Sequence, residues 1–451
     1  MQSSFEENVS GIYEPSAEMG VSILPASSTL SSQPDATCDA FILDASLRQS
    51  LMTARSLGRR GKSIVALETS SILQRSKHVP TFSSRWCQAA IIVPGYEQQV
   101  APFVTRLMQA LDSTGARLLI SSSDGTIAVL RQHRAELEQR EVRLALAKES
   151  ALEVAISKEQ TLAVAEHLGL NIPRGVMLTA ESDVSAALHE IGLPAVVKPT
   201  ESWLWGQQQG MRLNCRLVTT PEEARHAVRQ LTQLGGKVLF QQFLSGRQES
   251  ISIFYARGDV YACFAQWTRR AHPPLGGVST YRQSIALPVD TTEQAERLIR
   301  AIELEGYAQV QFRRDSSGKP YLMEINPRLT SGIELAVRAG IDFPYLVYQW
   351  ANQEPIDRIN WYRPGVKMRY LEGDLLTTLQ TFSERGRPGT PPPATAVAEF
   401  ITSFFIPTGY DYFDWQDPRP AWTAAREILD HVWYKLHGRD QSVLTGGKDD
   451  K

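Results

Sequence analysis

The spacing of hydrophobic and polar positions predicts an α/β unit at the start of the chain. Between residues 39 and 120, short apolar runs alternate with longer stretches of helical spacing. Strands are predicted at 40–44, 63–67, 89–93 and 117–120, and helices at 47–57 and 100–111. Strands that alternate with helices of this length are typical of a parallel sheet with helices on both faces.

A charged stretch, 131–155, also has helical spacing and is interpreted as a helix that connects to two units of mixed α and β structure. In the first unit, helices are predicted at 158–168, 184–191 and 221–233, and strands at 175–178, 195–199 and 212–218. In the second, strands are predicted at 238–243, 251–255, 260–267, 307–313 and 320–326, with a helix at 292–305. The last two strands are separated by a short turn, so they are expected to form an antiparallel hairpin.

The two ends of the chain have weaker patterns. Residues 1–36 are rich in Ser, Glu and Pro and are predicted to be a mostly disordered leader, and the last dozen residues are also expected to be disordered. Residues 384–395 are Pro-rich and indicate a linker or a long loop, whereas 422–436 predict an amphipathic helix. The aromatic stretch 404–415 either packs on the body of the protein or forms a surface for a partner or a membrane.

Composition narrows the class of protein. The chain has 451 residues, which favours several domains, and its 42% hydrophobic and 21% charged content is that of a soluble globular protein. A formal net charge of −2 gives no electrostatic indication of nucleic-acid binding. The four cysteines form no CxxC pair, which argues against a zinc ribbon or a secreted disulfide scaffold. Without a signal-peptide pattern or an apolar run of about 18 residues, we expect a cytoplasmic protein with no transmembrane segment.

Oxygen donors gather on two adjacent predicted strands. Glu324 and Asn326 are two residues apart, so their side chains point to one face of a strand. The short turn folds this strand back on the one that contains Gln311, which can therefore lie opposite the pair. Such oxygens suit Mg²⁺, and Arg328 follows where the strand ends at Pro327, in a position suited to a phosphate contact. The alternative is an edge strand with solvated polar residues, against which the surrounding segment argues.

Two lysines are candidates for contact with an anion. Lys198 ends the apolar strand 195–197, where it either reaches the surface or meets an anion at the strand end. Lys158 begins a helix, where the helix dipole does not favour a cation. An anionic ligand would explain this position, and so would a plain surface lysine.

Taken in order, these residues resemble the ATP-grasp superfamily, and within it the carboxylate–amine ligase branch. The resemblance covers roughly residues 38–356 and is carried by Lys158, Lys198, Gln241–Leu244, Glu249, Gln311 and Glu324–Arg328. A metal set of Gln, Glu and Asn is similar to that of carbamoyl-phosphate synthetase. The resemblance implies α/β and α+β structure, with a Rossmann-like pre-ATP-grasp domain at 37–145 and a two-lobed ATP-grasp module at 146–356 (lobes about 158–235 and 237–356). Outside it lie the predicted disordered leader at 1–36 and a C-terminal extension at 357–451.

The resemblance also implies a role for each matching residue. ATP is expected with its phosphates on Lys158 and Lys198, and with Mg²⁺, or Mn²⁺ in its place, beside them. Arg328 is expected to contact the transferred phosphoryl group or an acyl phosphate. The adenine is expected against Gln241, Gln242, Phe243 and Leu244, the ribose on Glu249, and the metal on Gln311, Glu324 and Asn326. Many members of the superfamily have Glu where this chain has Gln241 or Gln242.

The segment 268–282 is predicted to be an arginine-rich loop. Its side chains Arg269, Arg270 and Arg282 are expected to grip a substrate carboxylate beside Arg328, unless they are ordinary surface arginines. Glycines 276 and 277 suit a loop that closes on an anion.

The resemblance makes the loop 201–210 a lid over the phosphates. Such lids are usually small and Gly-rich, whereas this one contains Trp203 and Trp205. These rings either shield an acyl phosphate and touch substrate, or simply pack.

The implied activity is that of an ADP-forming ligase that activates a carboxylate with ATP and joins it to an amine. Its partners would be small-molecule carboxylate and amine substrates and no nucleic acid, and a homodimer is left open. One alternative is a bicarbonate-using carboxylase or carbamoyl-type enzyme, which the metal set favours and the single ATP module opposes. Another is a non-catalytic nucleotide-binding module, against which the complete metal ligands argue.

Overall fold

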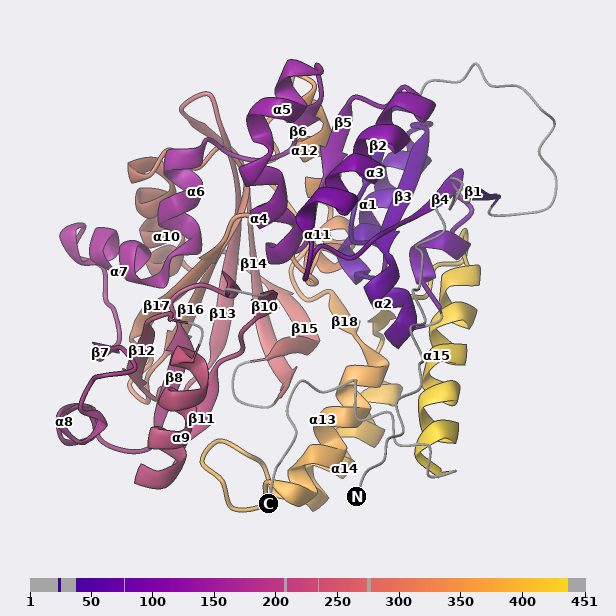
Figure 1. Cartoon of the computed structure of the whole chain (residues 1–451). Helices are drawn as coiled ribbons and strands as arrows, with labels where there is room; N and C mark the ends of the chain where they lie inside the picture. The colour runs from indigo at the N-terminus through magenta and orange to yellow at the C-terminus, as the bar shows by residue number, and fades with distance from the viewer. Residues whose placement is uncertain are drawn as a thin grey trace, which may run out of the picture.

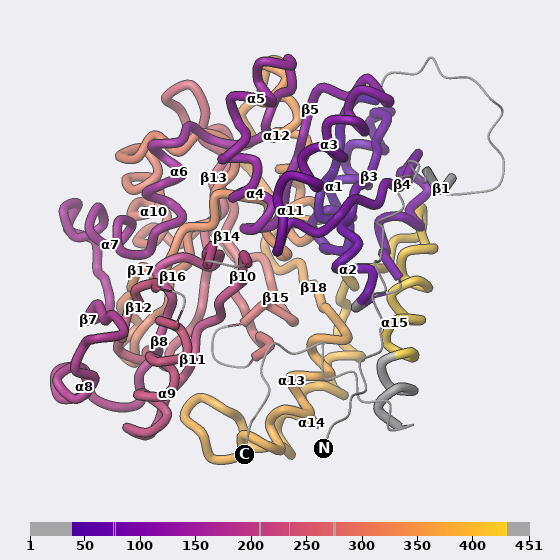
Figure 2. The backbone as a smooth tube through the Cα atoms, in the orientation of Figure 1, coloured from indigo at the N-terminus to yellow at the C-terminus, as the bar shows by residue number. Residues whose placement is uncertain are grey.

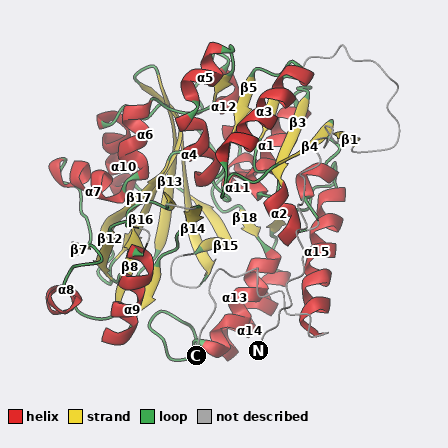
Figure 3. Cartoon of the chain, in the orientation of Figure 1, coloured by secondary structure: helices red, strands yellow, loops and turns green. Residues whose placement is uncertain are grey.

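The computed structural model describes residues 23–25, 38–76, 78–206, 209–233, 235–273 and 277–436. Three large sheets and a small hairpin organise these residues (Figures 1 and 3). None of the described helices is both long and apolar enough to cross a membrane. Most of the two predicted terminal disordered segments lies outside the described residues.

The N-terminal unit contains the predicted parallel sheet. Its strands follow the order β1-β4-β3-β2-β5-β6, in which only β1 is antiparallel to its neighbour. Because β1 pairs with β4, the expected disordered leader is ordered at these three residues. The elements are β1 (Ile23–Pro25), β2 (Ala40–Ile42), α1 (Arg48–Arg59), β3 (Ile64–Thr69), α2 (Ser70–Arg75), η1 (Pro80–Ser83), β4 (Ala89–Val93), α3 (Val100–Thr114), β5 (Leu118–Ile120), α4 (Asp124–Gln132), α5 (Arg134–Gln139) and β6 (Arg143–Leu144).

The single connecting helix predicted over 131–155 is wrong. That stretch divides into the end of α4, α5, β6 and α6 (Glu149–Ile156). The reason is tertiary: Arg143 pairs with Leu118 at the sheet edge, which places Leu144 and Leu146 in the core. The strand β6 has only two residues, so the helical spacing of charged and apolar residues around it does not reveal it.

The next unit is a four-stranded antiparallel sheet in the order β11-β8-β12-β7, with two helices packed on it. The strand β12, expected to open the C-terminal lobe, instead lies between β8 and β7 of this sheet. The segment 200–210 forms part of a small hairpin rather than an open loop. The elements are α7 (Lys158–His167), β7 (Gly175–Leu178), α8 (Val184–Ile191), β8 (Ala195–Pro199), β9 (Trp203–Trp205), β10 (Gly210–Arg212), β11 (Arg216–Val218), α9 (Pro221–Thr232) and β12 (Val238–Gln242).

The third unit is a seven-stranded sheet in the order β17-β16-β13-β14-β15-β18-β19. Its last two strands come from the expected C-terminal extension, so part of that extension completes the sheet. The elements before the extension are β13 (Gln248–Ala256), β14 (Asp259–His272), β15 (Val278–Ile285), α10 (Val289–Ala301), β16 (Gly306–Arg314), β17 (Pro320–Asn326), α11 (Ile333–Ala339) and α12 (Phe343–Ala351). The extension adds β18 (Lys367–Arg369), α13 (Leu371–Ser383), α14 (Pro393–Thr402), η2 (Ser403–Phe405), β19 (Gly409–Tyr410) and α15 (Arg419–Leu436).

The C-terminal extension returns to the N-terminal unit. Helix α15, shown in yellow in Figure 2, packs against η1. The predicted linker 384–395 is the turn between α13 and α14, and its last residues already belong to α14. Within the aromatic stretch, the ring of Tyr412 packs edge-on against Tyr370 with centroids 6.1 Å apart, whereas Phe405 and Trp415 remain exposed.

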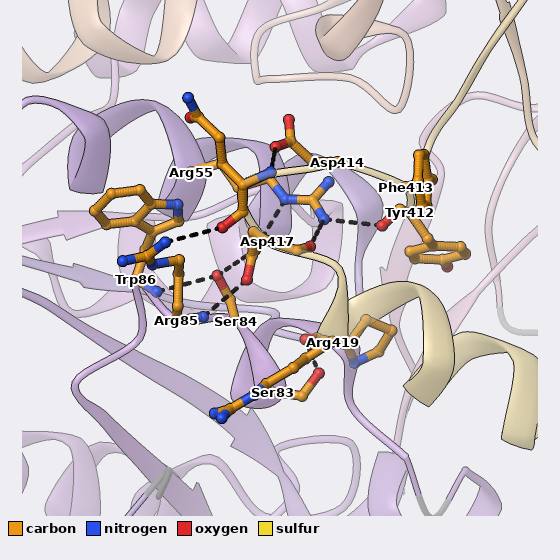
Figure 4. Close-up of polar contacts among 12 residues, drawn as sticks. Arg55, Ser83, Ser84, Arg85, Trp86, Tyr412, Phe413, Asp414, Asp417 and Arg419 are labelled. Atoms are coloured by element: carbon orange, nitrogen blue, oxygen red, sulfur yellow. Dashed lines mark hydrogen bonds and ion pairs between the residues drawn. The ribbon is translucent and has the colours of Figure 1, made fainter.

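Residues 409–417, here called the clasp, hold the N-terminal unit through buried ion pairs (Figure 4). Asp417 accepts from the Arg55 Nε at 3.0 Å, the Ser84 hydroxyl at 2.7 Å and the Arg85 backbone N–H at 2.9 Å. Arg55 also donates to the backbone carbonyls of Tyr412 and Asp417, at 2.8 and 3.0 Å. Because both charged side chains are buried, these partners compensate for their lost hydration.

Candidate active site

The hairpin β16–β17 brings the predicted metal donors together. Gln311 lies directly opposite Glu324, and Gln309 lies opposite Asn326, so the register inferred from the sequence is confirmed. The Asn326 amide lies 3.4 Å from the Glu324 carboxylate. Three side-chain oxygens therefore line one face of the hairpin, which is a donor set that fits a hard divalent cation.

Both predicted lysines lie beside this face. The Lys158 Nζ is 3.6 Å from the Glu324 carboxylate, and its backbone N–H donates to the Thr200 carbonyl at 2.9 Å, at the end of β8. Lys198 is buried and has no ion-pair partner within the part of the chain that the structure describes. Burial lowers the pKa of Lys198, and the nearby charges of Lys158 and Arg313 act in the same direction, whereas Glu324 opposes them. A buried cation surrounded by other cations is a favourable place for a polyanion.

Strand β12 turns one predicted adenine residue to the sheet face that carries Lys198. Gln241 lies opposite Val196, so it shares a sheet face with Lys198, which lies opposite Leu239. Gln241 is 1% exposed, and neither its amide nitrogen nor its amide oxygen has a hydrogen-bond partner among the described residues. A buried amide with both groups unsatisfied is costly, and a ligand with a donor and an acceptor would satisfy it.

The backbone of this segment is less available than expected. The Gln242 N–H donates to the Arg174 carbonyl at 2.9 Å, and the Leu244 carbonyl accepts from the Arg313 guanidinium at 2.9 Å. The prediction that the backbone of Gln241–Leu244 binds a base edge therefore applies at most to the remaining groups, which include those of Phe243. Among the buried side chains of this segment, the Gln241 amide has no partner in the described part of the chain.

Glu249, which was expected to bind the ribose, lies on the sheet face opposite to the metal donors. Alternation along β13 turns Glu249 to the opposite face from Gln311, where it accepts from the Arg314 guanidinium at 2.6 Å and the Thr291 hydroxyl at 3.1 Å. The residue on the metal face is its neighbour Gln248, whose amide lies 3.4 Å from the Gln311 oxygen. The predicted strand began only at Ile251, so the alternation that separates Gln248 from Glu249 was not applied to them.

Arg328 reaches the N-terminal unit. Its Nε and Nη2 donate to the two carboxylate oxygens of Asp124 at 2.5 and 3.0 Å. Burial alone would raise the pKa of Asp124, but the charges of Arg328, Arg212 and Lys158 outweigh it and lower that pKa. Asp124 was not singled out from the sequence, because an acid in the first turn of a helix is also an ordinary capping choice.

The expected arginine-rich loop is instead the continuation of β14 and β15. Arg282 is fully buried and donates to both oxygens of Asp411, at 2.5 and 3.1 Å. Arg270 donates to Asp374 at 2.5 and 2.7 Å, whereas Arg269 is exposed beside the Trp267 ring. The first two arginines therefore bind carboxylates of the C-terminal extension, which the local sequence could not indicate.

The lid hairpin closes against the N-terminal unit. The Trp203 ring lies 5.5 Å from both Tyr96 and Trp205, and the Gly210 N–H donates to the Glu97 carbonyl at 2.6 Å. Trp203 also lines a cavity together with Asp124, Lys158, Glu324 and residues of α4 and α6. The ring thus packs on its neighbours and also bounds the space beside the metal donors.

Comparison with known proteins supports this geometry. Residues 236–373 match the family described as ATP-grasp in the biosynthetic pathway with Ter operon. The D-alanine–D-alanine ligase of Ectopseudomonas mendocina is 28% identical over 208 residues, which cover 43% of this chain and 64% of that ligase. The corresponding ligase of Nitrosospira multiformis is 29% identical over 211 residues, covering 43% and 65%. The chain thus spans less than two thirds of the length of these relatives.

Solved structures share the fold at low sequence identity. Biotin carboxylase from Campylobacter jejuni superposes with a TM-score of 0.58 at 14% identity, covering 73% of this chain and 74% of that chain. The L-amino acid ligase from Bacillus licheniformis gives a TM-score of 0.54 at 18% identity, covering 74% and 79%. These structures show the fold alone, and together with the sequence relatives and the family match they support the resemblance to the ATP-grasp superfamily that the sequence motifs indicated.

Proposed function

We propose that this protein is an ADP-forming ligase that activates a carboxylate with ATP and joins it to an amine. The observation that carries the proposal is that Lys158 and Lys198 lie close to Glu324, on the hairpin face that also carries Gln311 and Asn326. These side chains supply metal donors and phosphate-binding cations in one place. The relatives named as D-alanine–D-alanine ligases and the L-amino acid ligase neighbour support amide-bond formation between small molecules.

Each residue acts by position and charge. Gln311, Glu324 and Asn326 would hold Mg²⁺, or Mn²⁺, which supplies Lewis-acid stabilisation of the phosphates when bound. Lys158 and Lys198 would bind the phosphate oxygens and neutralise charge during phosphoryl transfer. Arg328 would orient the activated carboxylate, with Asp124 holding its guanidinium. We replace Glu249 by Gln248 as the candidate for the ribose.

The fold leaves room for the lid to exclude water. Trp203 bounds the cavity beside Glu324, so the lid would shield an acyl phosphate from hydrolysis. The substrates would be a small carboxylate and an amine, in the cytoplasm. We also propose that two copies of the chain associate; a biotin carboxylase domain of this fold from Hydrogenobacter thermophilus is described as a dimer.

A bicarbonate-using carboxylase is the second candidate. It is favoured by the fold shared with biotin carboxylase and with N5-carboxyaminoimidazole synthetase from Staphylococcus aureus, each below 16% identity. Because such likeness shows the fold alone, the ligases, which match at about twice that sequence identity, weigh more. A non-catalytic nucleotide-binding module is disfavoured by the complete metal donor set.

One assay separates the candidates. The purified chain is mixed with MgATP and pairs from an amino-acid panel, and ADP, AMP and phosphate are measured together with the joined product. We expect ADP and phosphate in equal amounts, and only when an acid–amine pair is present. Stimulation by bicarbonate without an amine would favour the carboxylase, and AMP with pyrophosphate would refute both.

Gln241 provides a sharper test of nucleotide binding. Gln241→Met keeps the side-chain length but removes the unsatisfied amide, so the variant is expected to be at least as stable as the wild type without nucleotide. Its Kd for MgATP should rise about tenfold, which corresponds to the loss of one or two hydrogen bonds. Thermal unfolding with and without MgATP measures both effects.

The exposed Gln353 serves as a matched control, since Gln353→Met should change neither quantity. A Gln241→Met variant that loses stability without nucleotide while binding ATP normally would contradict this role.

A further inference from the structure

The side chain of Trp203 carries a buried hydrogen-bond donor without an acceptor in the described part of the chain. Its indole Nε1 is shielded from solvent, and no described residue accepts a hydrogen bond from it. A buried tryptophan N–H normally finds an acceptor, because leaving such a group unpaired costs free energy. An acceptor on a bound molecule would remove this cost, so the surroundings of Trp203 indicate what that molecule is.

Two glycines fix the position of the indole. A Cβ atom at Gly125 of α4 would lie 2.9 Å from the ring carbons Cε3 and Cζ3, and one at Gly210 of β10 would lie 2.5 Å from Cζ2. Only glycine lets two backbones approach the ring so closely. The Tyr96 ring also packs against the indole, with centroids 5.5 Å apart. Because Nε1 is on the opposite side of the indole from Cε3 and Cζ3, its N–H does not point at Gly125.

The cavity beside Trp203 indicates the ligand. Its lining also contains Lys158 and the metal donors Glu324 and Asn326. Under the proposed function these groups surround the phosphoryl group that ATP transfers, and the oxygens of that group accept hydrogen bonds. Trp205 also has an unpaired Nε1, but Trp205 is not among the described residues that line this cavity. The cavity and the unpaired donor therefore coincide at Trp203.

We propose that the Trp203 indole N–H donates a hydrogen bond to an oxygen of the transferred phosphoryl group, which makes Trp203 a catalytic residue. This inference rests on the proposed function and adds one named contact at the same site. An indole nitrogen donates and does not accept, so it presents no lone pair to the negative charge. The ring also excludes water, and a fixed donor in such surroundings stabilises developing charge more strongly than it would in water.

A purely apolar role explains the ring less well. Ile127, Ala128 and Ile156 line the same cavity, which therefore already has apolar walls. A phenylalanine in place of Trp203 would supply an aromatic surface without burying an unpaired N–H. The indole nitrogen is useful only when a bound molecule accepts from it.

The test compares the binding of two probes by the full chain, measured by isothermal titration calorimetry. Trp203→Phe keeps an aromatic ring against Tyr96 and removes the N–H. The variant should bind MgADP as the wild type does. It should bind MgADP with aluminium fluoride, which occupies the place of the transferred phosphoryl group, about 10- to 100-fold more weakly, as expected for the loss of one hydrogen bond to a charged group. Thermal unfolding without nucleotide should show no loss of stability, since the unpaired N–H is removed.

Two further variants control the result. Gly125→Ala keeps the indole N–H but displaces the ring, so it should also weaken binding of the aluminium fluoride complex. Trp86→Phe removes an equally unpaired indole N–H from a residue that packs against Gly58, in the N-terminal unit. This second variant should bind both probes like the wild type.

The outcomes separate this inference from the proposed function. Equal affinity of Trp203→Phe and the wild type for both probes, or equal weakening for both, would overturn the contact with the phosphoryl group. So would a wild type that gains no affinity from aluminium fluoride, or a change confined to the KM for the amine, which would make the ring a wall of the substrate site. A wild type that binds both probes but forms no ADP with any acid–amine pair would refute the ligase, and the comparison of the probes would still decide the role of Trp203.

Discussion

Replacing Glu324 by glutamine is expected to lower kcat for ADP formation by roughly 10²- to 10³-fold. The substitution keeps the size of the side chain and one oxygen, but removes the negative charge that lies 3.6 Å from Lys158 and faces Gln311. The metal would then be held by neutral amides alone, beside two lysines that repel it. The measurement is steady-state ADP release with magnesium varied, and the variant should require more Mg²⁺ for half-maximal rate.

The control is Glu303→Gln, which removes the same charge from an exposed residue after α10. This variant should keep the wild-type rate and the wild-type dependence on Mg²⁺. Glu324→Gln also removes the ion pair with Lys158 and could therefore lower the stability of the fold. The thermal unfolding of the variant is compared with that of the wild type to separate this effect from the loss of activity. Wild-type turnover by a folded Glu324→Gln protein would exclude the metal triad.

The metal hairpin could be predicted because every relation within it is local. A turn of five residues fixes which side chains of β16 and β17 oppose each other, and alternation fixes their faces. Gln311 and Glu324 therefore lie opposite each other as inferred. The same reasoning misplaced Glu249 because the predicted strand began at Ile251, three residues after the start of β13. Glu249 was therefore treated as part of a loop, and the alternation of faces along the strand was not applied to it.

Partners distant in sequence could not be predicted. Arg282 and Arg270 look like substrate ligands until Asp411 and Asp374 are placed beside them, more than 100 residues later in the chain. The buried side of α13 is polar for the same reason. Its threonines and Asp374 face inward because buried arginines on neighbouring strands require a carboxylate, and no periodicity in the helix itself encodes that requirement.

Removing the Asp417 carboxylate from the clasp is expected to produce a large loss of stability. In Asp417→Ala, Arg55 stays buried and charged with only backbone carbonyls as partners, and the Arg85 N–H and Ser84 hydroxyl lose their acceptor. Removing one partner of a buried pair costs about 3–5 kcal/mol in the free energy of unfolding. Urea unfolding of the full chain measures the loss.

Asp414 offers the matched comparison within the same segment. It pairs with Arg59 where both side chains retain some exposure, 16% and 29%, so Asp414→Ala should cost at most about 1 kcal/mol. The double variant Arg55→Met with Asp417→Leu should recover much of the loss, because an apolar pair leaves no uncompensated charge. If Asp417→Ala lowered the free energy of unfolding no more than Asp414→Ala, the clasp would contact the N-terminal unit without stabilising it. A difference of several kcal/mol that the double variant reverses would instead show that Arg55 needs the clasp carboxylate, and hence that the extension completes the fold.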